Sequence, residues 1–141
     1  MQDELVIELK GQLTEIARLA GQVEAFGSRN HVPDTAIGHI NLALDELITN
    51  TISYGVVDAP SHRIKVTLRL DHGALSVELL DNGRPFSPFQ AGDPDLTRSL
   101  EDRAIGGLGL YFVRKLMDHV DYEHVNGHNR VTLIKNTAPG T

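Results

Sequence analysis

The spacing of apolar residues predicts a strand and two helices in the first part of the chain. Residues 4–10, ELVIELK, are rich in apolar and β-branched residues, with Leu5, Ile7 and Leu9 at alternate positions, which is typical of a strand. Apolar residues then recur at three- and four-residue steps over 12–26 and again over 33–54, which predicts two amphipathic helices. Pro33 suits the start of the second helix, and Gly55 suits its end.

The second part of the chain predicts two hairpins separated by a loop and a helix. The residues from Asn82 to Gly107 contain three prolines and no steady period. Loops longer than about 12–15 residues are usually functional lids or disordered segments. The predicted elements are strands 63–70 and 74–81 around an Asp-His-Gly turn, a helix over 108–120, and strands 121–125 and 130–135 around the letters NGHN.

This order of elements predicts an α+β fold, a two-layer sandwich in which helices cover one face of a mostly antiparallel sheet. We expect residues 1–141 to form a single domain. Arg63, Lys65 and Arg69 alternate with apolar residues, so they should lie on the exposed face of the sheet. An edge strand such as 4–10 can pair with a second copy of the chain, which favours a homodimer.

Composition excludes several classes of protein. The chain has no cysteine, which rules out disulfide scaffolds, thiolate metal sites and cysteine nucleophiles. The net charge is −6, and no long basic block offsets it, so direct binding to nucleic acid is not expected. The chain lacks an apolar run of the roughly 18–20 residues that a membrane span needs. We expect a cytoplasmic protein that does not bind membranes.

The first candidate for chemistry is the stretch LDELITN at residues 44–50. Glu46 and Asn50 lie four residues apart and therefore on the same side of a helix, at the flank of its apolar stripe. Their oxygens can bind a hydrated Mg²⁺, or Glu46 can act as a general base. An ordinary polar flank remains the other interpretation, and Asp45 should be solvated.

The second candidate is the Asp-Asn-Gly segment that follows the strand 74–81. Such a segment is most often a simple turn. A buried Asp81 could also accept a hydrogen bond from an amino group such as that of adenine, and the site would then reject analogues without that donor. Gly83 would allow the backbone to approach a ring closely.

The third candidate is GGLGL at residues 106–110, directly before the helix 108–120. Glycines there leave backbone N–H groups available for an anion at the helix N-terminus. The dinucleotide pattern G-x-G-x-x-G fails at Phe112, and the P-loop pattern is absent. A tight turn into the helix is the alternative interpretation.

Together the three motifs resemble the GHKL (Bergerat-fold) ATPases in order and spacing. Within that superfamily, LALDELITNTISYG, LLDNGRPF, GGLGLYFVRKLMDHVDY and the closing NRVTLIK are similar to the RsbW-like anti-sigma-factor serine kinases. The resemblance covers nearly the whole chain. Two departures stand out: Tyr54 replaces a histidine that many relatives carry, and Gly-Gly-Leu replaces the Ser-Gly-Met of several kinases.

The resemblance implies ATP and Mg²⁺ as ligands and assigns roles to particular residues. Residues about 88–107 would form a lid over the nucleotide, with Arg103 or Arg98 reaching the γ-phosphate. The other implied roles are Mg²⁺ coordination by Asn50, general base catalysis by Glu46, adenine binding by Asp81, Gly83 and Thr132, and phosphate binding by backbone amides of Gly107, Leu108 and Gly109.

The resemblance also implies a biological activity. Such a protein phosphorylates a serine of a STAS-domain anti-sigma antagonist and sequesters a sigma factor, and phosphorylation resets this partner switch. One alternative is a catalytically inactive ATP-binding module that acts on partners through its lid alone. Another is the ATP-binding half of a two-component sensor, although no segment resembles its phosphoacceptor helix.

Overall fold

The described residues fold into one five-stranded antiparallel sheet with helices on one face. The computed structural model describes residues 2–54, 62–83, 85 and 107–137. The strand order is β1-β2-β3-β5-β4. The strands are β1 (Gln2–Lys10), β2 (Arg63–Asp71), β3 (Ala74–Asp81), β4 (His119–Val125) and β5 (His128–Asn136). The described helices are α1 (Glu15–Arg29), α2 (Asp34–Tyr54) and α3 (Gly107–Leu116).

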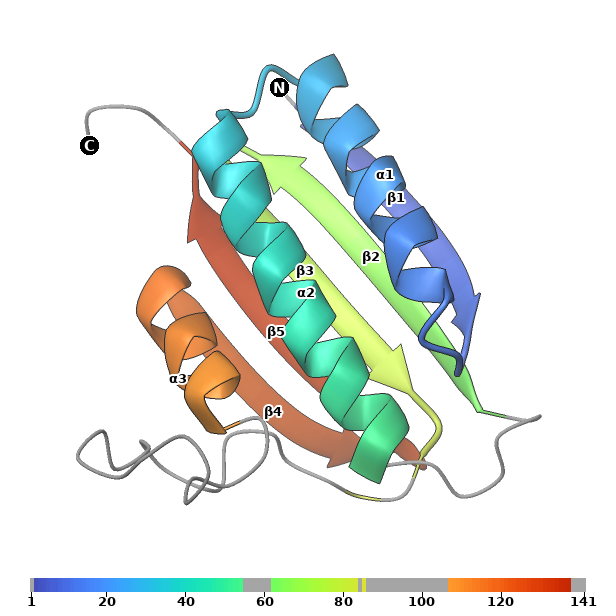
Figure 1. Cartoon of the computed structure of the whole chain (residues 1–141). Coiled ribbons are helices and arrows are strands. Elements are labelled where there is room, and N and C mark those ends of the chain that lie inside the picture. Colours follow the sequence, from blue (N-terminus) through green and yellow to red (C-terminus); the bar gives the residue numbers. More distant parts are fainter. Residues whose placement is uncertain (1, 55–61, 84, 86–106, 138–141) are drawn as a thin grey trace.

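Figure 1 shows these three helices side by side on the same face of the sheet, with α2 over the middle. The predicted α+β two-layer sandwich is therefore confirmed. The strand 4–10 lies at one edge of the sheet, within β1. None of the helices in the described ranges is long and apolar enough to cross a membrane.

The core lies between the helices and the inward face of the sheet. Alternate residues of β2 and β3 are buried, as the alternating sequence predicts, and Thr67 of β2 is buried in addition. Among the fully buried large side chains of the described residues, only Phe26 is aromatic. Arg63, Lys65 and Arg69 are exposed on the opposite face, as expected. The stripe of aliphatic residues on α2 packs against this inward face, which fixes the rotation of the helix about its axis.

Several predicted boundaries were wrong. The first helix, expected over 12–26, begins and ends three residues later, at Glu15 and Arg29. The helix expected over 108–120 ends at Leu116, because the Lys135 ammonium donates to the Leu116 carbonyl at 2.6 Å and Asp118 N donates to Ile134 O at 2.9 Å. The residues after α3 therefore pair with β5, although apolar residues continue at helical spacing beyond Leu116 in the sequence. The last hairpin turns through Asn126 and Gly127 alone, with φ of 54° and 77°, so both strands extend further than expected.

One end of the sandwich brings together segments that are distant in sequence. The C-terminal ends of α2 and β3 lie there with the N-terminal ends of α3 and β5 (Figure 1). The start of β2 belongs to the same end, because Ile64 pairs with Asp81. All three candidate motifs of the sequence are on these segments.

Candidate functional site

Asp81 is the centre of a buried polar cluster at this end of the sandwich. It is the last residue of β3, and it faces the helices in alternation with Val77 and Leu79. Only 4% of Asp81 is exposed. A buried carboxylate needs hydrogen-bond donors to offset the loss of hydration. We call Asp81, Gly83, His62, Asn129 and Tyr122 the Asp81 cluster.

Three donors surround one oxygen of Asp81. Its Oδ1 accepts hydrogen bonds from the backbone N–H of Gly83 at 2.8 Å and from Asn129 Nδ2 at 3.2 Å. His62 Nε2 lies 3.4 Å from the same oxygen. Among the described residues, no donor is within hydrogen-bond distance of Oδ2. The arrangement therefore holds the carboxylate through one oxygen and leaves the other as an acceptor for a ligand.

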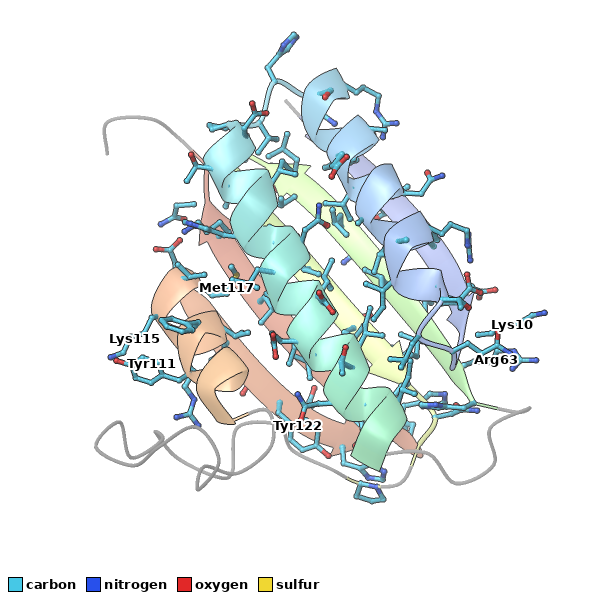
Figure 2. All side chains as sticks on the ribbon, viewed as in Figure 1. Lys10, Arg63, Tyr111, Lys115, Met117 and Tyr122 are labelled. Atoms are coloured by element: carbon cyan, nitrogen blue, oxygen red, sulfur yellow. The ribbon has the colours of Figure 1, made fainter. Side chains whose placement is uncertain are left out.

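The ladder between β3 and β5 places Asn129 beside Asp81, because the two residues are directly paired. Tyr122 on β4 donates its hydroxyl hydrogen to Asn129 Oδ1 at 2.5 Å. Figure 2 shows Tyr122 at the end of the sheet between α2 and α3. Since the amide oxygen accepts from Tyr122, the amide nitrogen is directed toward Asp81 Oδ1 and the Gly83 carbonyl, 3.4 Å away. Asn129 thus connects three elements of the site.

Glu46 and Asn50 lie in the last turns of α2. Asn50 is 5% exposed, and its Nδ2 donates to the Glu46 carbonyl at 2.8 Å. Asn50 is therefore more deeply buried than the predicted flank position. Its amide nitrogen is engaged by the helix backbone, so Oδ1 is the atom that remains for a ligand, and no donor among the described residues contacts it. An amide oxygen held in this way is a suitable Mg²⁺ ligand.

The environment of Glu46 suits proton transfer. The residue is half-buried, and burial raises the pKa of its carboxyl group above the usual value, with a smaller contribution from the neighbouring Asp45 carboxylate. A carboxylate whose pKa is raised toward neutrality is a better proton acceptor. Asp45 itself is exposed, as predicted, and accepts a hydrogen bond from Thr49 at 3.3 Å.

The part of the glycine motif that the structure describes, residues 107–110, forms the first turn of α3. Gly107, Leu108 and Gly109 are helical, so their backbone N–H groups are among those that lack intrahelical acceptors. The helix α3 lies beside α2. Arg98, Arg103 and residues 88–106 of the expected lid lie outside the described residues.

The structure places Thr132 away from the other candidates, which corrects the expectation that it borders the same site. Asn129, Val131 and Leu133 are buried toward the helices, so Thr132 lies on the opposite face of β5. Its partner across the ladder is Glu78, three residues before Asp81. The residue of β5 that reaches Asp81 is Asn129.

No motif in the sequence points to His62, Asn129 or Tyr122. A usable signal was present in the alternation of the strands. Counting back by two from the inward residues Ile64 and Val131 gives His62 and Asn129. The two-residue Asn-Gly turn would then have set the register of β4 against β5.

Comparison with known proteins supplies the family. The model of the histidine kinase-like ATPase domain matches residues 9–135. The chain is 35% identical to the serine/threonine-protein kinase BtrW of Bordetella bronchiseptica over 100 residues, which is 71% of this chain and 70% of that one. It is 28% identical to the serine-protein kinase RsbW of Listeria monocytogenes over 133 residues, covering 90% and 83% of the two chains.

Further similarities agree with these. The anti-sigma F factor of Clostridium botulinum is 28% identical over 116 residues, covering 77% of this chain and 75% of that one. Among solved structures, the RsbU and RsbW domains of a Mycobacterium tuberculosis protein superpose with a TM-score of 0.69 at 18% identity, over 95% of this chain and 32% of that one. The catalytic domain of histidine kinase ThkA gives a TM-score of 0.54 at 15% identity, over 96% and 99% of the chains. The structural similarities support the fold.

Proposed function

Because this chain belongs to the histidine kinase-like ATPase domain family, which implies that it binds ATP, we propose that it is a serine/threonine-protein kinase dependent on ATP and Mg²⁺. Its substrate is a serine of a STAS-domain anti-sigma antagonist, and it sequesters a sigma factor when that antagonist is phosphorylated. The relatives named serine-protein kinase and anti-sigma F factor support this proposal.

The observation that carries the proposal is the convergence of three motifs at one end of the sandwich. Asp81, with its free Oδ2, supplies an acceptor for the adenine amino group. Gly83 beside it is buried and has no side chain, so the backbone there can approach the ring closely. Glu46 and Asn50 come to the same end on α2, together with the first turn of α3 (Figure 1). One bound nucleotide can therefore contact the adenine-binding, metal-binding and phosphate-binding groups at the same time.

The donor set fits Mg²⁺, which prefers oxygen ligands and keeps several waters. Asn50 Oδ1 would hold the ion, because Nδ2 is engaged by the Glu46 carbonyl. Bound Mg²⁺ would neutralise negative charge on the phosphates. The backbone N–H groups of Gly107, Leu108 and Gly109 would add hydrogen bonds to the same phosphates.

The chain's own part in the transfer is to position the reactants and accept a proton. Glu46 takes the proton of the substrate serine hydroxyl. The serine oxygen forms a bond to the γ-phosphorus as the bond from that phosphorus to the bridging oxygen of ADP breaks. The products are phosphoserine, ADP and a protonated Glu46, which returns its proton to solvent.

Several further features belong to the same proposal. Residues 1–141 form a single domain whose lid spans about 88–107, and Arg103 or Arg98 contacts the γ-phosphate. The protein is cytoplasmic and dimerises with a second copy. The exposed edge of β1 supports the dimer, since unpaired strand edges favour the addition of another strand.

The test is a phosphorylation assay with purified protein, Mg-ATP and a STAS-domain protein from the same genome. We expect phosphoserine on the STAS protein with wild type and a loss of at least about 100-fold in rate with Glu46→Gln. The matched control is Glu24→Gln, the same chemical change at an exposed carboxylate on α1, which should keep wild-type activity.

Two other outcomes would change the conclusion. ATP binding without phosphoserine would identify an inactive partner-switch module. Failure of wild type to bind ATP in isothermal titration, with and without Mg²⁺, would remove the nucleotide-binding proposal altogether.

A further inference from the structure

His62 is a buried polar residue to which the proposed reaction assigns no role. Its side chain is 1% exposed, and it lies directly before β2. Its Nε2 is 3.4 Å from Asp81 Oδ1. Its Nδ1 is buried and has no hydrogen-bond partner among the described residues.

The unpartnered nitrogen argues against a role in packing alone. A carboxylate oxygen can only accept a hydrogen bond, so His62 Nε2 carries the hydrogen in the contact with Asp81 Oδ1, and Nδ1 is a buried polar atom without a hydrogen-bond partner among the described residues. Leaving such an atom unsatisfied costs free energy that an apolar side chain of similar shape would avoid. The contact with Asp81 is what an apolar residue could not supply.

The position of the ring is set from the side of β1. A β-carbon built on Gly11 would lie 2.6 Å from His62 Nδ1 and 2.9 Å from its Cβ and Cγ. The backbone N–H of Gly11 also donates to the His62 carbonyl at 3.1 Å. The ring therefore rests against the Gly11 backbone with one edge and faces Asp81 with the other.

We propose that His62 is a positioning residue that sets the preference of the site for adenine, an inference that rests on the proposed ATP binding. By donating to Oδ1, together with Gly83 and Asn129, it fixes the rotation of the Asp81 carboxylate. Oδ2 is then held toward the 6-amino group of the base. Gly11 takes part indirectly, because only a residue without a side chain leaves room for the ring.

The test separates the hydrogen bond from the shape of the side chain. His62→Phe keeps a ring of similar size and removes the donor, whereas His62→Gln keeps a terminal N–H donor and removes the ring. Isothermal titration with Mg²⁺ would measure the Kd of each variant for ATP and for purine riboside 5′-triphosphate, which lacks only the 6-amino group. The ratio of the two Kd values reports contact with that group.

We expect wild type to prefer ATP by about tenfold or more, as for a hydrogen bond to a charged acceptor. His62→Phe should lower this ratio by roughly three- to tenfold, and His62→Gln should largely retain it. A residue with a purely structural role would weaken binding of both nucleotides equally and leave the ratio unchanged.

Gly11→Ala tests the same inference from a different element. The added methyl group must displace the ring, so the ratio should fall as in His62→Phe. Gly21→Ala is the matched control, because a β-carbon there meets nothing within 4 Å. If His62→Phe does not fold, as judged by thermal unfolding, the comparison of Gly11→Ala with Gly21→Ala decides.

The possible failures are distinguishable. If wild type does not bind ATP, the proposed function is wrong. If wild type prefers ATP but His62→Phe and Gly11→Ala keep the full ratio, the role of His62 is wrong and the proposed function stands. A ratio lost in His62→Gln but retained in His62→Phe would also contradict it, because shape rather than the donor would then matter.

Discussion

The carboxyl group of Glu46 is held where ionisation costs free energy. Burial in the last turns of α2 removes hydration from the carboxylate, and Asp45 adds repulsion, so the pKa of Glu46 is raised. A group that accepts a proton during catalysis benefits from this environment, whereas the stability of the fold does not. The same residue should therefore link activity and stability in opposite directions.

Glu46→Gln should stabilise the native state at neutral pH while it abolishes phosphoryl transfer. The raised pKa means that native Glu46 binds a proton more tightly than unfolded Glu46, whose value is close to 4.5. Stability of wild type therefore falls as pH rises from about 4.5 through the raised value, and the loss is complete above it. Urea unfolding at a series of pH values should show a gain for the variant that is full near pH 8 and vanishes below about pH 4.5. A gain in stability of the same size near pH 8 and below about pH 4.5 would contradict this assignment.

At the scale of elements, the close approach of α1 and α2 depends on Gly27. A β-carbon at this position would lie 2.5 Å from Ile37 Cγ1 and 2.6 Å from its Cδ1. Gly27 is buried near the C-terminal end of α1, and Ile37 belongs to the first turns of α2. The two helices must pack this closely if both are to cover the same sheet.

Gly27→Ala should destabilise the protein by about 1–3 kcal/mol, because the methyl group forces Ile37 or the helix to move. Gly21→Ala on the same helix should instead stabilise it by roughly 0.5–1 kcal/mol, since the site is open and alanine favours the helix. Chemical denaturation of the two variants measures the difference. Equal effects of the same sign would show that helix propensity, rather than contact with Ile37, decides.

At the scale of the whole molecule, no single segment of the chain contains the candidate site. Asp81, Asn129 and Asn50 come from β3, β5 and α2, and His62 lies directly before β2, so each is placed by the sheet or by helix packing. Unfolding of any one element would therefore disperse the cluster. Ligand binding and global folding should be coupled.

ATP with Mg²⁺ should consequently raise the unfolding temperature. At 100 times its Kd, a ligand that binds only the native state stabilises by about 2.7 kcal/mol, a shift of roughly 6–12 °C for a domain of this size. Asp81→Ala should reduce the shift strongly, and Gly21→Ala should preserve it. A scanning fluorimetry series that shows the full shift in Asp81→Ala would place the nucleotide elsewhere.

The repeat of apolar residues by itself determined the fold class, the order of the elements and several of their boundaries, among them both ends of β3. Periodicity is a local property, so the sequence records it directly. The motifs on α2, β3 and α3 were also visible, because their residue types and spacings are local. The end of α3 was not, since Lys135 and Ile134 from a distant strand ended the helix.

Only the tertiary structure decided which side chains meet. The face on which a strand residue lies relative to Asp81 depends on the pairing register, and a shift of one residue moves every side chain to the other face. The resemblance implies a role for Thr132 at the adenine site, but the register of β5 against β3 places Asn129 there instead. His62 comes within reach of Asp81 only through the pairing of β2 with β3. The β4–β5 register follows from the local Asn-Gly turn, whereas the β3–β5 register is set by contacts between segments that are distant in sequence.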